Sequence, residues 1–80
     1  MVFRVRIKMC GMTRREDIKT AAMLGVDAVG LIFYEPSPRA VTLDKARELL
    51  TDFPALMSVV AVFVNPEPDM VEQVLSELPV

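Results

Sequence analysis

The feature that most constrains the fold is a threefold alternation of strand-like and helix-like segments. Residues 28–33 and 57–64 are largely apolar on both faces and too short to be helices. Strands of this kind are typical of a parallel sheet covered on both sides. Residues 3–10 alternate apolar with polar side chains at a period of two, which predicts a strand ahead of them. The predicted order is therefore β-α-β-α-β-α, an α/β fold with right-handed crossovers.

The first helix has recognisable start and stop signals. Thr13 is followed three residues later by Glu16, which fits a capping box with Thr13 at the N-cap. Apolar side chains then recur at helical spacing up to Gly25, which we expect to end the helix in a left-handed conformation.

The second and third helices are bounded by similar signals. Thr42 is expected to cap a helix that ends near residues 53–54, and Asn65 and Pro66 are expected to be the N-cap and first helical position of the last helix. Each unit then takes roughly 25–30 residues, close to the ~31 per unit of an eight-unit barrel. A small open sheet and part of a larger barrel both fit this spacing.

Composition excludes several classes of function. The 80 residues contain one cysteine and no histidine, which excludes an internal disulfide, a histidine-based zinc site and a Ser-His-Asp triad. A net charge of −2 does not indicate a nucleic-acid partner, and no apolar stretch approaches the ~18 residues of a membrane helix. We expect a cytoplasmic protein, where a lone thiol stays reduced.

Two residues are candidates for a functional site. Cys10 lies at the end of the first predicted strand, where α/β folds keep their sites, and Lys8 shares its face. A nearby cation favours a thiolate, although a lone cysteine is more often a small buried hydrophobe. Arg39 lies in a loop stiffened by prolines, and its guanidinium suits a substrate carboxylate unless it is only a solvated loop residue. The turn from Gly11 to Thr13 is a weak candidate for anion binding at a helix N-terminus.

A series of motifs resembles a known family. Lys8-Met9-Cys10-Gly11-Met12-Thr13 is followed by Gly30-Leu31-Ile32-Phe33-Tyr34, by Ser37-Pro38-Arg39 and by Val62-Phe63-Val64-Asn65. In this order and at this spacing they resemble the N-terminal part of phosphoribosylanthranilate isomerase, over nearly all of the chain. The resemblance implies that residues 1–80 are the first three βα units of a (β/α)₈ barrel.

The resemblance also implies a reaction. That family isomerises N-(5-phosphoribosyl)anthranilate in tryptophan biosynthesis by an Amadori rearrangement, with no metal or organic cofactor. Cys10 matches the family's general base, and Arg39 matches the arginine that contacts the anthranilate carboxylate. Lys8, Gly11 and Thr13 belong to the same motif, and we expect them to support the site.

The length of the chain limits what the resemblance implies. The family continues past Val80 into further βα units, which carry its general acid and its phosphate site, so we expect the 80 residues alone to be inactive. An alternative is a non-catalytic α/β fragment that folds by self-association or against a complementary C-terminal portion. A further alternative is a dual-substrate barrel sugar isomerase, which the Ser37-Pro38-Arg39 loop disfavours because a carboxylate clamp serves only anthranilate.

Overall fold

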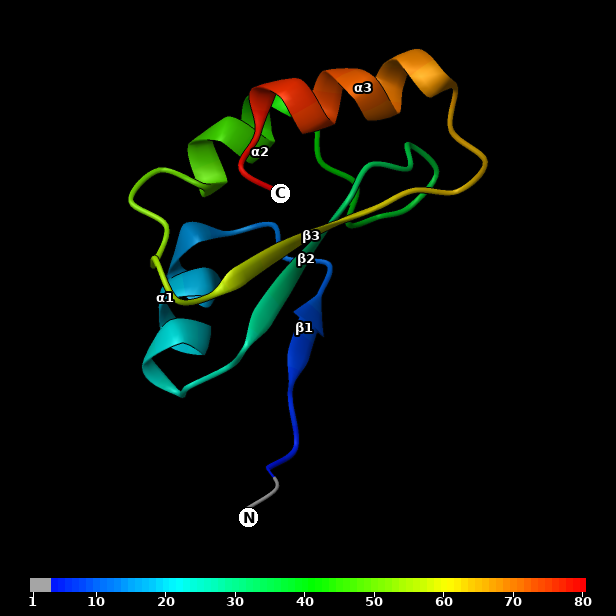
Figure 1. The fold of residues 1–80 in the computed structure, drawn as a ribbon. Helices are drawn as coiled ribbons and strands as arrows, with labels where there is room; N and C mark the ends of the chain where they lie inside the picture. Colours follow the sequence, from blue (N-terminus) through cyan, green and yellow to red (C-terminus); the bar gives the residue numbers. More distant parts are fainter. Residues whose placement is uncertain (1–3) are drawn as a thin grey trace.

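The predicted alternation of strands and helices is present in the computed structural model, which describes residues 4–80. The elements are β1 (Lys8–Cys10), α1 (Arg15–Met23), β2 (Ala28–Ile32), α2 (Leu43–Leu49), β3 (Ser58–Val62) and α3 (Pro68–Glu77). The three strands form one parallel sheet in the order β1-β2-β3 (Figure 1). The predicted fold class and strand direction are thus confirmed.

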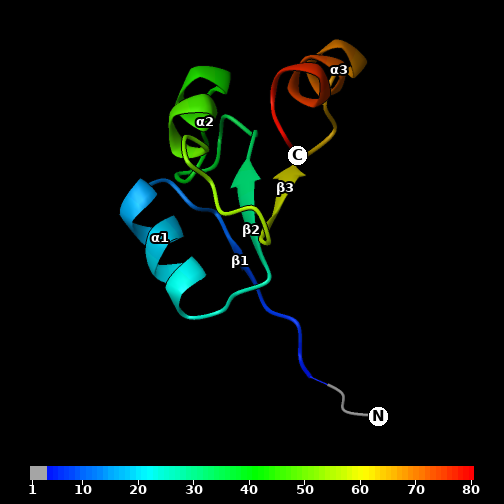
Figure 2. The same ribbon diagram turned by 60° about the vertical axis from the view of Figure 1, so that its left-hand side comes forward.

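The core lies on one face of this sheet. Val29, Leu31 and Val59, which alternate along β2 and β3, are buried in one cluster with side chains from all three helices. In Figure 2 the three helices lie on one side of the sheet. The opposite face carries Val60, which is 37% exposed.

Within residues 4–80 the helices cover only one face of the sheet, so the described chain does not supply the second covered face that the apolar strands indicate. Consecutive right-handed crossovers between neighbouring strands place every helix on the same side, as on the outside of a barrel. The open face corresponds to the side that a barrel turns inward.

The first strand is shorter than predicted. Pairing begins at Lys8, and residues 4–7 do not belong to a strand, although the Ile7 carbonyl accepts the N–H groups of Asp27 and Ala28 at 3.0 and 3.2 Å. Phe3, where the predicted strand began, lies outside the described residues. Strands β2 and β3 also lie inside their predicted limits.

The predicted capping box at the first helix is wrong. The N-cap is Arg14, in an extended conformation and without a side-chain capping bond, and the helix begins at Arg15. The Glu16 carboxylate instead accepts a hydrogen bond from Arg14 Nε at 3.2 Å. The helix end was predicted correctly, since Gly25 has φ +79° directly after the C-cap.

The later caps were predicted with mixed success. Thr42 caps α2 as expected, because its hydroxyl accepts the Lys45 N–H at 3.1 Å, but that helix already ends at Leu49. The last helix begins at Pro68 rather than Pro66, with Glu67 extended at its N-cap. A residue that precedes a proline is disfavoured in helical conformation, which explains why Glu67 stays outside the helix.

Candidate active site

Two chain-distant segments meet at the carboxyl edge of the sheet. Cys10 is the last residue of β1, and Arg39 lies in the loop between β2 and α2. The guanidinium Nη1 of Arg39 donates a long hydrogen bond, 3.3 Å, to the carbonyl oxygen of Cys10. The structure thus brings together the two residues that the sequence singled out.

The loop that carries Arg39 is held by its own hydrogen bonds. The Ser37 hydroxyl accepts the Arg39 N–H at 3.1 Å, and the Ser37 N–H donates to the Tyr34 carbonyl at 2.9 Å. At the loop's end, the Val41 N–H donates to the Ile32 carbonyl at 2.8 Å. Ser37 belongs to the motif, but its role as the residue that fixes the Arg39 backbone was missed. A serine two residues before an arginine in a turn is the signal that indicates it.

The Arg39 side chain packs on the backbone of the turn that follows β1. Gly11 has φ +79°, and a Cβ placed there would lie 2.6 Å from Arg39 Nη1 and 2.8 Å from Cζ. Within residues 4–80, Arg39 forms no ion pair with a carboxylate. An exposed guanidinium held in place without an acidic partner suits an external carboxylate.

Cys10 is exposed rather than buried. Its side chain lies on the open face of the sheet, outside the core cluster of the described residues. By strand alternation Lys8 lies on the same face, and it too is exposed. Thr13 is half-buried in the turn between Gly11 and α1, where the Gly30 carbonyl accepts the N–H groups of Gly11 and Met12 at 3.0 and 3.1 Å.

Two phenylalanines brace the same edge of the sheet. The rings of Phe33 and Phe63 are stacked with their centroids 5.6 Å apart, and the Phe33 N–H donates to the Val62 carbonyl at 2.9 Å. Both residues directly follow a strand, so their stacking joins the starts of two loops. Each was part of a motif, but the contact between them was missed because it spans two units.

The family model for N-(5'-phosphoribosyl)anthranilate (PRA) isomerase matches residues 7–80, which include all of these positions. The chain belongs to the PRA isomerase family. The three parallel βα units correspond to the N-terminal portion of the PRA isomerases that they match.

Individual relatives agree with this assignment. The N-(5'-phosphoribosyl)anthranilate isomerase of Legionella pneumophila strain Corby is 56% identical over 77 residues, which are 96% of this chain and 37% of the relative. The crystal structure of phosphoribosyl anthranilate isomerase from Thermotoga maritima superimposes with a TM-score of 0.88 at 39% identity, over 92% of this chain and 36% of that one.

A second solved PRA isomerase is in complex with reduced 1-(O-carboxyphenylamino)-1-deoxyribulose 5-phosphate. It has a TM-score of 0.88 and 39% identity over 92% of this chain and 38% of that one. This chain therefore spans little more than a third of the length of the relatives it matches.

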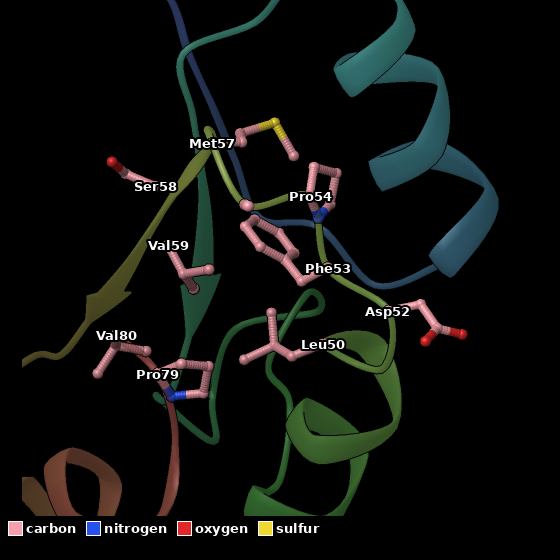
Figure 3. Close-up of a pocket in the computed structure, with 10 residues that line it drawn as sticks. Leu50, Asp52, Phe53, Pro54, Met57, Ser58, Val59, Pro79 and Val80 are labelled. Atoms are coloured by element: carbon pink, nitrogen blue, oxygen red, sulfur yellow. The ribbon is translucent and has the colours of Figure 1, made fainter.

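A hollow of about 690 Å³ lies at the other end of the sheet. Figure 3 shows it between the end of α2, the start of β3 and the C-terminal residues Pro79 and Val80. In barrels of this kind the amino ends of the strands serve stability rather than catalysis, so this hollow is not the candidate active site. The part of the chain that the structure describes contains no cluster of three metal-ligating side chains, and none of its helices is long and apolar enough to cross a bilayer.

Proposed function

We propose that this chain supplies the general base and the carboxylate-binding arginine of a PRA isomerase. The substrate is N-(5-phosphoribosyl)anthranilate and the product is 1-(2-carboxyphenylamino)-1-deoxyribulose 5-phosphate, formed in tryptophan biosynthesis in the cytoplasm. The observation that carries the proposal is the contact of the Arg39 guanidinium with the Cys10 backbone at the carboxyl edge of the sheet.

The proposed chemistry is a pair of proton transfers. A general acid protonates the ribose ring oxygen, and the C1′–O bond breaks to give an open-chain protonated imine. The Cys10 thiolate then removes the C2′ proton, and the electron pair of that C–H bond moves towards the imine to give an enolamine. The enolamine tautomerises to the ketone. The imine accepts the electrons, so the protein has to supply positioned proton transfer and anion binding.

Arg39 is proposed to orient the substrate for this step. A guanidinium offers planar pairs of N–H donors that match a carboxylate, and charge-assisted bonds of this type are about twice as strong as neutral ones. One N–H of Nη1 donates to the Cys10 carbonyl and holds the guanidinium beside the base, so its other N–H groups can bind the substrate carboxylate. The aromatic acid would then lie at a fixed distance from the thiol.

Residues 1–80 are proposed to be the first three βα units of the barrel. The general acid and the phosphate site would be supplied by the part of the barrel that the longer relatives have beyond the matched segment. We expect the 80-residue chain alone to be inactive, and we expect a complementary C-terminal portion to restore turnover. A complex of this chain with itself that turned over substrate would contradict this division of the site.

The decisive experiment uses a completed barrel, in which this chain replaces the matching N-terminal segment of the Legionella pneumophila isomerase. Cys10→Ala should lower kcat by at least about 10²-fold, the low end of what a general base contributes. Substrate binding and the melting temperature should stay near those of the parent. Near-normal turnover of a folded Cys10→Ala barrel would remove Cys10 from the mechanism.

A further inference from the structure

Gly30 of β2 lies directly opposite Cys10 in the sheet. The two residues are register partners in the parallel pairing of β1 with β2. A Cβ placed on Gly30 would lie 2.8 Å from Cys10 Sγ, 3.3 Å from its Cα and 3.4 Å from its Cβ. The thiol therefore lies in the space that any other residue at position 30 would fill.

Backbone conformation does not explain this glycine. Gly11 and Gly25 have positive φ angles, whereas Gly30 has the conformation of an ordinary strand residue that other amino acids adopt. A glycine inside a strand lacks a side chain to pack and costs conformational entropy. The close approach of Cys10 is the feature of this strand that a side chain would disturb.

The main chain of Gly30 also holds the turn that follows the cysteine. Its carbonyl accepts the N–H groups of Gly11 and Met12 at 3.0 and 3.1 Å. Any residue supplies a carbonyl there, so these bonds fix the backbone of Cys10 without requiring glycine. What glycine alone provides is the empty space beside its Cα, which Cys10 Sγ occupies.

We propose that Gly30 is a positioning residue for the Cys10 thiol, and this rests on the proposed function of Cys10 as the base. The thiol has a single χ1 torsion with three staggered wells. A methyl group at position 30 would exclude the observed position and turn Sγ into another well, away from the C2′ proton. Gly30 would thus act on catalysis through Cys10, without touching the substrate carboxylate at Arg39.

The test is Gly30→Ala in the completed barrel. Since a displacement of about 1 Å costs on the order of 10²-fold in rate, kcat should fall by about that factor while KM changes less than about threefold. A structural defect alone would not separate kcat from KM in this way. An unchanged kcat, or an equal loss in both constants, would overturn the proposal.

A double-mutant cycle tests the contact itself, independently of activity. Gly30→Ala should lower the melting temperature in the parent and lower it less in a Cys10→Ala background, because the closest of the three contacts, to Sγ, is then gone. If Gly30→Ala does not fold but the Gly30→Ala, Cys10→Ala double variant does, the result likewise supports the proposed contact. Equal losses in both backgrounds, or no folding in either, would overturn the proposal. If Cys10→Ala keeps its turnover, the base assignment fails while the cycle still reports whether Gly30 positions the thiol.

Discussion

The guanidinium of Arg39 lies on the main chain of Gly11, so closely that a first side-chain carbon on the glycine would lie 2.6 Å from Nη1. The residues are far apart in the chain, and their contact joins the turn after β1 to the loop after β2. Because the position of the guanidinium depends on this bare stretch of backbone, a methyl group on Gly11 should push it away.

Gly11→Ala in the completed barrel should therefore raise KM by about 10-fold, the loss of one charge-assisted hydrogen bond. Gly25→Ala is the matched control, because Gly25 has the same φ of +79° and a Cβ there would meet nothing within 4 Å. Both variants should lose about 1–2 kcal/mol of stability from the left-handed conformation. Steady-state kinetics would contradict the prediction if the two variants had the same KM.

Arg39 itself should determine the affinity for the carboxylated substrate. Arg39→Ala should raise KM by at least about 10-fold, and Arg39→Lys should fall between it and the parent, because lysine keeps the charge but loses the planar fork. Both melting temperatures should stay close to that of the parent, since Arg39 is exposed and unpaired within residues 4–80. Equal affinity in all three proteins would return Arg39 to the role of a solvated loop residue.

Part of the fold and part of the site could be predicted from the sequence alone. The α/β order, the Thr42 cap and the Gly25 stop depend on neighbouring residues, and periodicity and side-chain chemistry predicted them correctly. The Thr13 cap failed because the helix begins at Arg15, one residue later than the spacing indicates, which places Glu16 at the second helical position instead of the third that a capping box needs. Proximity of Cys10 and Arg39 followed from the rule that parallel strands end at one edge.

The details of the site required the three-dimensional structure. The sequence showed a glycine inside the strand at 30, but not that Cys10 Sγ occupies the space beside it. The stacking of Phe33 on Phe63 was equally invisible, because the two rings belong to different βα units. Such contacts join residues of neighbouring strands, and the pattern of one strand alone does not show which residues become register partners.

An ion pair between Arg4 and Asp27 lies at the amino end of the sheet, and its contribution to stability should depend on pH. Asp27 accepts hydrogen bonds from both terminal nitrogens of Arg4 and from the Ile7 N–H at 2.8 Å, which joins the segment before β1 to β2. The Arg4 guanidinium first, and the Ile7 N–H second, hold the pKa of the Asp27 carboxyl below its ordinary value. Since the unfolded chain binds the proton more tightly, the ionised carboxylate stabilises the fold above about pH 4, and this contribution is lost as the pH falls further.

Asp27→Asn should therefore lower the melting temperature of the completed barrel at pH 7, and the gap to the parent should narrow at pH 3. Asp52→Asn is the control, because its carboxylate is 89% exposed and 3.8 Å from its partner Arg15. A gap for Asp27→Asn that was the same at both pH values, measured by thermal unfolding, would show that the carboxylate's charge does not matter.

The last helix, α3, is held by an ion pair and by buried apolar side chains, and the two contributions to stability can be compared by mutation. Arg47 of α2 bonds Asp44 at 2.7 Å and reaches across to Glu77 of α3. Its side chain is 45% exposed, so Glu77→Gln should cost at most about 1 kcal/mol. Leu78→Ala, at the buried C-cap of α3 where the side chain is 6% exposed, should cost about 2–5 kcal/mol. Denaturant unfolding that ranked the two the other way would contradict a core-dominated attachment.

Lys8 lies two residues before Cys10 on the open face of β1, and its charge should increase the reactivity of the thiol. Both side chains are exposed, so water screens their interaction to about 1 kcal/mol or less and the effect should be a change of several-fold at most. Lys8→Met should thus slow alkylation of Cys10 by a neutral reagent at low salt, and Lys8→Arg should not. High salt should remove the difference between Lys8→Met and the parent, because exposed charges are screened within a Debye length. Equal alkylation rates for all three proteins at low salt would exclude Lys8 from any role in activating the base.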